Sequence, residues 1–459
     1  MIESLVRASI QQRLVVLVIA LMLMLAGVFA VKKLSVDAFP DVTNIQVLIA
    51  TNASGKSPEE VERFITVPIE IGMTGLPGLT EMRSLNKNGL SLITLVFTDD
   101  TSVYFARQLV MERLAEVMSK MPDGVTPVLG PVSTGLGEIY QYTLDKSSDG
   151  TKELSQEDLT ERRTAQDWVV RPLLRSIPGV AEINSQGGYV KQYQTIVDPD
   201  RLSHYGLKLS DVYLALAKNN TNSGAGVLPQ YEEQYLIRGV GLIQHLDDIR
   251  AIVLKERNGV PVYMRDVAEV KLGHEVRVGS LIKNGDTEAV GGVVMMMRGG
   301  NAKEVVSRIK ARVKEINEKK MLPGNLEIKP FYDRSELVDA ALLTVIKVLI
   351  EGVILVIAIL FLFLGDVRSS LIVVVTLLLT PLMTFMAMNY YGISANLMSL
   401  GGLTIAIGLM VDGSVVVVEN TFHRLGHDKS TGKLRIILES ATEVGKPVLF
   451  GIGIIILVF

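Results

Sequence analysis

Long apolar segments lie at the two ends of the chain, and a mixed, charged region separates them. Residues 14–31 contain 18 positions without a charge, just long enough to cross a hydrocarbon core of ~30 Å. The alternative is a cleavable signal peptide, but this run exceeds the usual ~7–15 apolar residues. In addition, Lys32 and Lys33 follow where small residues would precede a cleavage site. We therefore predict an uncleaved membrane helix within an N-terminal unit at 1–37.

Hydrophobicity returns near the C-terminal end, where the pattern predicts three further spans. The second span of the chain lies within 336–368. Residues 369–411 then contain no charge over 43 positions, which is enough for two crossings. We place these crossings in 369–392 and 393–420.

A polar, amphipathic segment follows at 421–446, and the apolar residues 447–459 close the chain. As a helix this last stretch would extend about 20 Å, which is too short to cross the bilayer. We interpret 447–459 as the start of a truncated fifth span, and the chain as a fragment of a longer protein.

Basic residues predict the orientation of the spans. Five Lys and Arg residues lie in 421–446, and loops rich in these residues stay in the cytoplasm. Counting back through the spans places residues 32–340 outside and the N-terminus inside. We therefore predict a multi-pass membrane protein with a large exported domain.

The exported region has the pattern of two α+β repeats separated by a third unit. Residues 38–135 show the order strand–helix–strand–strand–helix–strand, which is the split βαβ or ferredoxin-like pattern. The pattern recurs over 136–185 and 276–335, with an adjoining strand at Gln192–Val197. The intervening segment, 186–275, is rich in short strands and turns. The predicted fold class is α+β, with a transmembrane helical bundle joined to split βαβ subdomains.

Composition narrows the class of protein. The mean hydropathy of the 459 residues is +0.34, which favours a membrane protein with a large soluble part. Lys+Arg 46 against Asp+Glu 49 gives a net charge of −3, so no basic excess is available for nucleic acid. The absence of Cys excludes a disulfide framework, Cys-ligated zinc, an iron–sulfur cluster and a thiol nucleophile.

Motifs for hydrolytic chemistry are also absent from the sequence. It contains no G-x-x-x-x-G-K-[ST] phosphate loop and no G-x-S-x-G nucleophile motif. We therefore expect no enzymatic activity and no cofactor. If the protein transports a substrate, the energy must come from an ion gradient.

Two carboxylates inside the span at 393–420 are the strongest candidates for chemistry. Asp412 lies deep in apolar sequence, where a charged carboxylate costs about 2.5 kcal/mol or more, so it is expected to face a partner or a proton path. Glu419 follows about two turns later and shares that face. Gly408 lies on the same face and is expected to permit close helix contact. The alternatives are a structural role for Asp412 and an interfacial position for Glu419.

Methionines in the same span are candidates for metal contact. Met398 and Met410 carry thioether sulfur, a soft ligand for Cu(I) or Ag(I). The alternative is packing, because methionine is a common apolar filler. The two residues are about 18 Å apart along a helix and roughly 120° apart around it, so they cannot bind one ion together.

The five histidines of the chain are scattered, and one pair lies close in sequence. His423 and His427 are four residues apart and could chelate a metal ion if they were helical. Gly426 lies between them and argues against a helix there.

Six short motifs along the chain are specific as a set: Asp37–Val42, Arg83–Ser91, Tyr104–Val110, Gly130–Glu138, Gly179–Gly188 and Met410–Asn420. With these motifs the whole chain resembles the N-terminal half of a heavy-metal exporter of the resistance–nodulation–division (RND) superfamily, the CusA/CzcA group.

The resemblance implies proton-driven efflux of metal cations, with Asp412 and Glu419 as a proton relay. It implies a homotrimer in the bacterial inner membrane, whose subunits contain a second half that this chain lacks. It also implies two partners, a periplasmic adaptor (membrane fusion protein) and an outer-membrane channel.

The same resemblance gives names to the subdomains. Residues 38–135 match the first porter subdomain, and 136–185 with 276–335 match the second. Residues 186–275, with a flanking porter strand, match the docking subdomain that meets neighbouring subunits and the channel. The segment 421–446 is then cytoplasmic.

Departures from the family pattern bear on the metal. Zinc/cobalt-type members carry an additional acid where this chain has Ala406, whereas the copper/silver type has a small residue there and methionines that match Met398 and Met410. However, Val417 stands where a further methionine of that type would be. We expect Cu(I) or Ag(I), with Zn, Co or Ni as the alternative.

Two other hypotheses remain open at this point. One is a drug or solvent exporter of the same superfamily, which transport assays with metals and dyes would distinguish. The other is a non-transporting, truncated half that acts as a scaffold.

Overall fold

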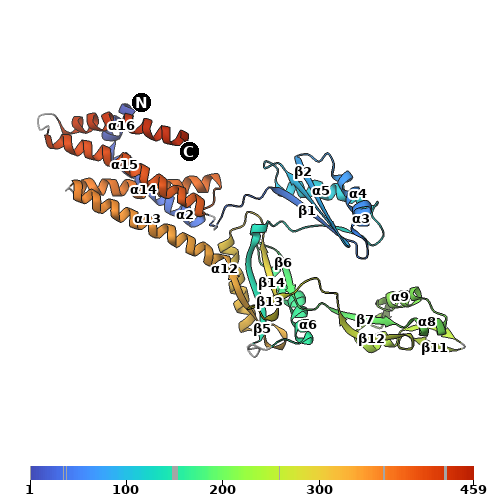
Figure 1. The fold of residues 1–459 in the computed structure, drawn as a ribbon. Coiled ribbons are helices and arrows are strands. Elements are labelled where there is room, and N and C mark those ends of the chain that lie inside the picture. Colours follow the sequence, from blue (N-terminus) through green and yellow to red (C-terminus); the bar gives the residue numbers. More distant parts are fainter. Residues whose placement is uncertain are drawn as a thin grey trace.

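A computed structural model shows a bundle of long helices at one end of the molecule and three α/β units that extend away from it (Figure 1). The structure describes residues 2–34, 36–37, 39–146, 153–257, 259–364, 367–427 and 432–458. Some side chains between 341 and 370, and those of 409–412, lie outside this description, so only their helical backbone is discussed.

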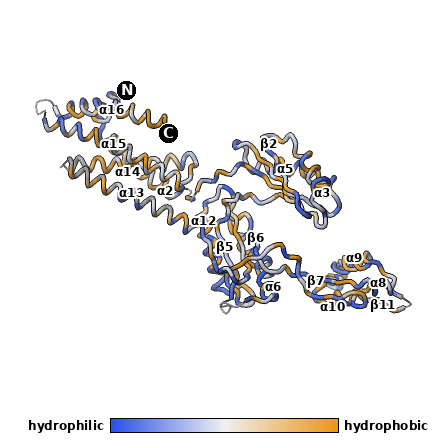
Figure 2. Tube along the Cα trace, in the orientation of Figure 1, coloured by the Kyte–Doolittle hydropathy of each residue, from blue (hydrophilic) through white to orange (hydrophobic). Residues whose placement is uncertain are grey.

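Both ends of the chain lie in the helical bundle (Figure 1). Its helices are α1 (Ile2–Gln11), α2 (Arg13–Lys33), α13 (Arg334–Leu364), α14 (Val367–Tyr391), α15 (Leu397–His427) and α16 (Lys433–Val458). Among the described residues, four segments are long and apolar enough to cross a membrane: Arg13–Val31, Leu371–Tyr391, Leu397–His427 and Lys433–Val458. α13 contains the apolar run predicted as the second span. Figure 2 shows apolar residues along these helices, whereas apolar and polar residues alternate in the α/β units.

Two helix boundaries in the bundle differ from the predictions. α15 continues past 420 to His427, so Gly426 does not interrupt it. A glycine costs a helix only about 1 kcal/mol relative to alanine, which a helix of 31 residues can offset. α16 is unbroken from Lys433 to Val458, so 447 is not a helix end, and the expectation that this stretch is too short to cross a membrane is wrong for the 26-residue helix. Arg435 and Glu439 form an ion pair of 2.8 Å on its polar first half.

The first α/β unit has the connectivity of the split βαβ pattern. Its elements are β1 (Ile45–Asn52), α3 (Pro58–Val61), η1 (Glu62–Thr66), α4 (Val67–Met73), β2 (Leu79–Lys87), β3 (Leu90–Phe97), α5 (Val103–Met118) and β4 (Pro127–Leu129). The antiparallel sheet has the order β2-β3-β1-β4. Ile49 and Leu95 of the sheet and Val110 of α5 are fully buried, so the core lies between the sheet and its helices.

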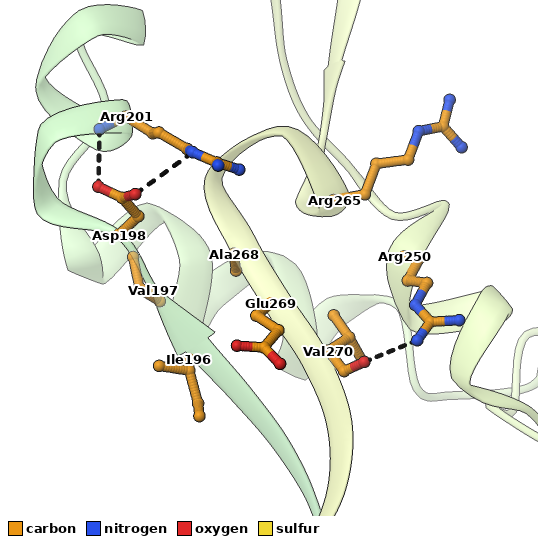
Figure 3. Close-up of a pocket in the computed structure, with 9 residues that line it drawn as sticks. All are labelled: Ile196, Val197, Asp198, Arg201, Arg250, Arg265, Ala268, Glu269 and Val270. Carbon is orange, nitrogen blue, oxygen red and sulfur yellow. Dashed lines mark hydrogen bonds and ion pairs between the residues drawn. The ribbon is translucent and has the colours of Figure 1, made fainter.

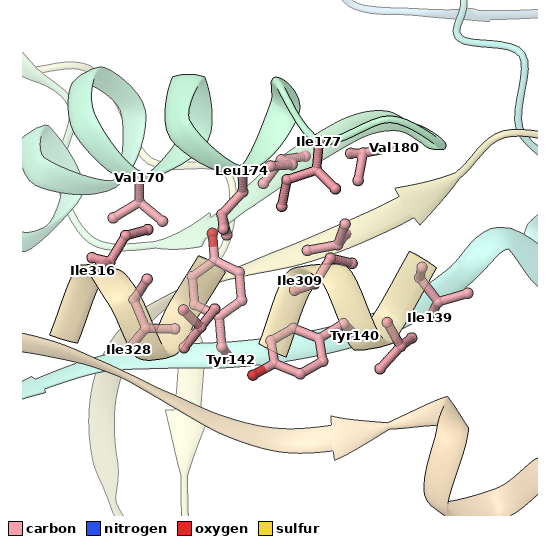
Figure 4. Close-up of a cluster of buried hydrophobic side chains, with 14 of the residues drawn as sticks. Ile139, Tyr140, Tyr142, Val170, Leu174, Ile177, Val180, Ile309, Ile316 and Ile328 are labelled. Atoms are coloured by element: carbon pink, nitrogen blue, oxygen red, sulfur yellow. The ribbon is translucent and has the colours of Figure 1, made fainter. Parts of the chain in front are cut away.

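The second α/β unit repeats this strand order. Its elements are η2 (Gly135–Gly137), β5 (Glu138–Lys146), α6 (Gln156–Ala165), η3 (Gln166–Val170), α7 (Arg171–Arg175), β6 (Val180–Gly187), β13 (Leu281–Lys283), β14 (Thr287–Met296), α12 (Ala302–Glu318), η4 (Pro323–Asn325) and β15 (Leu326–Asp333). β6, β14, β5 and β15 follow one another across the sheet. Tyr140 and Tyr142 project from β5 into a core with Ile309 and Leu174 (Figure 4).

A third unit is inserted between β6 and β13. Its elements are β7 (Lys191–Val197), α8 (Pro199–Tyr205), α9 (Leu209–Lys218), β8 (Ser223–Gln230), β9 (Glu233–Gly239), α10 (Leu246–Arg250), β10 (Val253–Arg257), β11 (Val260–Tyr263), α11 (Met264–Val267) and β12 (Ala268–His274). The antiparallel pair β7–β12 leads from the second unit to this one (Figure 1).

The strand predicted at Gln192–Val197 forms, but it does not flank the sheet of the second unit. It is part of β7 and pairs with β12 from Ala268 to His274. The cause lies just before it, where Gly187 and Gly188 have φ of +71° and +70° and turn the chain away from β6. β14 takes the place beside β6 instead.

Candidate functional site on helix α15

Helix α15 carries all four side chains that the sequence singled out for proton or metal movement. Met398 lies in its first turn with 72% of its surface exposed, and Glu419 is exposed towards the other end. For Met410 and Asp412 the structure gives the helical backbone, and their side chains lie outside the described part. Met398 and Met410 are about 18 Å apart along the helix, so they cannot share one ion.

The helix segment beside Asp412 packs closely against α16. A Cβ placed on Gly413 would lie 3.1 Å from Val448 Cγ1 of α16 and 3.8 Å from Ile452 Cδ1. We expected this role for Gly408, but no described atom outside its own helix lies within 4 Å of its Cβ position. The close approach therefore occurs one residue after Asp412, and it fixes that part of α15 against α16.

Further along, α15 and α16 are joined by polar contacts. Asn420 Nδ2 donates to the Ser440 carbonyl oxygen at 3.1 Å, and Ser440 Oγ donates to Thr421 Oγ1 at 3.0 Å. Arg424 forms an ion pair of 2.5 Å with Glu443. Ser440 is fully buried, so its hydroxyl group needs a partner, which Thr421 supplies. These contacts fix the rotation of α15 relative to α16.

On its other side, α15 packs against α14 and the end of α2. The buried apolar residues shared by these helices are Leu34, Leu377, Met388, Ala395, Leu400, Leu403 and Ile407. α2 and α14 also approach closely, because a Cβ on Gly27 would lie 2.5 Å from Leu382 Cβ. Met388 lies in this cluster and is only 6% exposed, which agrees with the packing role considered for methionines.

A buried ion pair joins the start of the bundle helices to the linker that precedes the first α/β unit. Arg334, the first residue of α13, donates to Asp37 Oδ1 from Nε at 3.0 Å and from Nη2 at 2.7 Å. It also donates to the Leu136 carbonyl oxygen. The Asp37 N–H donates to the Ala395 carbonyl oxygen at 3.1 Å, just before α15 begins. Asp37 thus connects α13 with the loop that leads into α15.

A second set of contacts holds the same linker against the second unit. Arg298, after β14, donates to the carbonyl oxygens of Thr43 and Asn44, the latter at 2.7 Å. Thr134 Oγ1 donates to Asp41 Oδ2 at 3.1 Å. Burial alone would raise the pKa of Asp41, but the hydrogen bonds from Thr43 and Thr134 and the positive charge of Arg298 outweigh it and lower this pKa.

Neither the Gly413 contact nor the Asp37–Arg334 ion pair was predicted from the sequence. For the ion pair the only signal was position, because Asp37 and Arg334 each lie close to the end of an apolar segment, among other charged residues. For Gly413 no local signal distinguishes it from Gly408, since both glycines lie in one helix and only the position of α16 separates them.

A separate concave site lies on the third unit and holds about 610 Å³ (Figure 3). Arg201, Arg250 and Arg265 line it. Arg201 pairs with Asp198 at 3.3 Å, and Arg250 pairs with Asp247 at 2.8 Å. These ion pairs offset part of the positive charge at the site. Among the described residues, no group of three or more His, Cys, Asp or Glu side chains is placed to hold a metal ion.

Comparison with known proteins gives matches along the whole chain. Residues 5–459 match the family model described as the AcrB/AcrD/AcrF family. The cobalt-zinc-cadmium resistance protein CzcA of Cupriavidus metallidurans is 44% identical over 100% of this chain, and the alignment covers 44% of that protein. The cation efflux system protein CusA of Escherichia coli K12 is 40% identical, with the same two coverages of 100% and 44%.

Solved structures agree with the sequence matches. The crystal structure of a heavy metal efflux pump superposes with a TM-score of 0.85 at 37% identity, covering 97% of this chain and 43% of that one. The chain therefore spans less than half the length of the proteins it matches.

Proposed function

The chain belongs to the AcrB/AcrD/AcrF family, and on that premise we propose that it is the N-terminal half of a proton-driven exporter of heavy-metal cations. The observation that carries this proposal is the position of Asp412. It lies in the middle of the 31-residue apolar helix α15, one residue before the close contact of Gly413 with α16. Placing a charged carboxylate within an apolar membrane helix costs free energy, so such a carboxylate is expected to face a polar or charged partner or an ion pathway.

In this proposal Asp412 takes up and releases protons, and Glu419 serves the same path nearer the membrane surface. The N-terminus and residues 421–446 are cytoplasmic, and residues 32–340 are periplasmic. The five basic residues in 421–446 support this orientation. Protonation of Asp412 removes a charge from α15, so the preferred packing of α15 against α16 differs between the two protonation states.

The contacts at Asp37 provide a route from this helix to the periplasmic units. Asp37 is hydrogen-bonded to Ala395, next to the start of α15, and ion-paired with Arg334 at the start of α13. α13 continues directly from β15 of the second unit. A shift of α15 or α13 therefore displaces the linker and the second unit together.

The three α/β units have proposed roles taken from the family. The first two are porter subdomains, and the third is the docking subdomain that meets neighbouring subunits of a homotrimer and an outer-membrane channel. The exposed hairpin β8–β9 supports a subunit contact, because every residue of both strands is exposed and they include Val227, Leu228, Leu236 and Ile237. A periplasmic adaptor completes the proposed assembly in the inner membrane.

For the transported ion we propose Cu(I) or Ag(I), with Zn, Co or Ni as the alternative. The support is chemical: Met398 and Met410 lie on the same helix as Asp412, and thioether sulfur is a soft ligand. Because the two sulfurs cannot share one ion, each would serve as one of two successive weak sites. A resistance profile for silver, copper, zinc, cobalt and nickel, with Met398→Ile and Met410→Ile, tests this assignment.

The proton role is tested with Asp412→Asn in the complete pump, expressed in a metal-sensitive host. We expect loss of metal resistance with normal expression and trimer assembly, because an amide cannot carry the proton. Glu419→Gln is the matched control, one charge removed on the same helix, and should have a smaller effect. Wild-type resistance in Asp412→Asn would remove this residue from the mechanism. Dye resistance without metal resistance in the unmodified pump would favour a drug exporter instead.

A further inference from the structure

The end of α15 brings two histidine rings together on one helix face. His423 and His427 are four residues apart, and their ring centroids are 4.3 Å apart with an angle of 27° between the planes. Both side chains are exposed. Two imidazole nitrogens that bind one tetrahedral ion at about 2.0–2.1 Å are about 3.3 Å apart, so rings at this spacing can reach one ion once they turn out of the stacked arrangement.

A hydrogen bond fixes which nitrogen of His427 is available. Its Nδ1 lies 3.0 Å from the carbonyl oxygen of His423. A carbonyl oxygen only accepts, so Nδ1 carries the hydrogen and the lone pair of the neutral ring is on Nε2. Metal-binding histidines commonly donate their second N–H to a backbone carbonyl in this way, which orients the ring and selects the tautomer.

The charges nearby permit a cation at this place. Arg424 follows His423 directly, but its guanidinium is turned to α16 and paired with Glu443 at 2.5 Å. His427 is also the last residue of α15, and the carbonyl groups at the C-terminal end of a helix favour positive charge.

We propose that His423 and His427 form a binding site for a borderline divalent cation such as Zn²⁺, Ni²⁺, Co²⁺ or Cu²⁺, the ions that imidazole prefers. The two rings supply two ligands, and water fills the other positions, so the ion exchanges readily. The site is separate from the thioethers of Met398 and Met410 in place and in chemistry. Binding itself does not depend on the proposed transport function. If that function holds, the site lies at the cytoplasmic end of the helix that carries Asp412.

The experiment is a Zn²⁺ titration of the full 459-residue chain in detergent, purified without a polyhistidine tag and followed by calorimetry. We expect one ion per chain in the unmodified protein. His423→Ala and His427→Ala should each weaken binding at least about tenfold, because a chelate that loses one of two ligands keeps only a single imidazole. His245→Ala in the third unit is the matched control and should leave binding unchanged.

A spectroscopic measurement keeps the test independent of the affinity. Cu²⁺ bound to the unmodified chain should show an electron paramagnetic resonance signal from two nitrogen ligands, and each single variant should lose it. The proposal is overturned if Zn²⁺ does not bind, if binding survives both alanine variants, or if the two-nitrogen signal is retained in either one. A pump that fails in transport but binds Zn²⁺ here would contradict the proposed function and leave this site intact.

Discussion

The two split βαβ units share a strand order but are attached to the helical bundle in different ways. In the second unit, β15 ends at Asp333 and α13 begins at the next residue, Arg334. The first unit is reached through a linker, which is held by side-chain contacts at Asp37 and Asp41. A displacement of α13 therefore reaches the second unit through the backbone and the first unit through replaceable side chains. Two units with the same fold are thus attached to one bundle differently, one directly through the backbone and the other through side-chain contacts on a linker.

The interiors of the two units differ as well. The core of the first unit is mostly aliphatic, with one polar contact in which the buried hydroxyl groups of Thr66 and Ser91 lie 2.6 Å apart. In the second unit the hydroxyl of the buried Tyr142 donates to Gln166 at 3.0 Å, and Asp145 pairs with Lys283 at 2.6 Å. Burial raises the pKa of Tyr140 to about 12, so this ring stays neutral at physiological pH. Directional contacts of this kind tie β5 to η3 and to β13, the strand that follows the inserted third unit.

The largest expected effect is at the Asp37–Arg334 pair. Arg334→Met removes the ion pair between Arg334 and the Asp37 carboxylate, whose side chain is only 17% exposed. Loss of one partner of a buried ion pair lowers the free energy of unfolding by about 3–5 kcal/mol. Hydrogen–deuterium exchange should rise in the linker and in the first unit and stay low in the second. Arg334→Lys is the control and should give a smaller rise. Equal loosening of both units would contradict the proposed difference in attachment.

The next effect concerns the turn that lets the third unit leave the second. Gly187 has a φ of +71°, and a Cβ on this residue would lie 2.2 Å from the Ala289 carbonyl oxygen. Gly187→Ala should therefore destabilise the second unit by about 2–3 kcal/mol, through overpacking and left-handed strain together. Gly55→Ala in the first unit is the matched control, since its φ is +85° but nothing lies within 4 Å. Equal losses in thermal unfolding would mean that the contact with β14 is unimportant.

Lowering the pH should destabilise the junction between the units, by less than Arg334→Met or Gly187→Ala destabilises the protein. Burial alone would raise the pKa of Asp333, but Lys310 and the hydrogen bonds from Ser335 outweigh it and lower this pKa, as found for Asp41. A lowered pKa means that the folded state favours the carboxylate form of Asp333. The resulting contribution to the free energy of unfolding is complete above the ordinary pKa of 3.8 and is lost as the pH falls through the lowered pKa of the folded state. Asp333→Asn should remove part of that pH dependence, measured as unfolding midpoints between pH 6 and about pH 2.

The smallest effect should be the same in both units. Ser57 and Ser155 cap the first helices of the two units through matching reciprocal contacts with Glu60 and Asp158. Ser57→Ala and Ser155→Ala should each cost about 1 kcal/mol. Similar losses of stability in the two units would show that their first helices are capped equally well. The difference between the units would then lie in their attachment to the bundle and in their cores. A loss several times larger in one unit would contradict this.

The candidate site was only partly predictable. An acid in an apolar segment is visible in any sequence, because the cost of burying charge in hydrocarbon is independent of the fold. The close contact that the described residues show lies at Gly413, where α16 approaches, and the expectation for Gly408 stays a prediction. The histidine pair was set aside on the helix propensity of Gly426, although the helix continues to His427. Propensity is a local preference that packing along a long helix overrides.

For this protein the sequence by itself indicated where the long apolar helices lie, although not the full extent of α16, and the strand–helix order of the two split βαβ units. Both depend on periodicity, since period 2 and period 3.6 place apolar residues on one face without reference to the rest of the chain. Only the tertiary structure decided the partners. It pairs Gln192–Val197 with β12 instead of the sheet next to it in sequence, and it joins Asp37 to Arg334. Contacts between residues far apart in the chain depend on how completed elements pack, and no local pattern of residues contains that information.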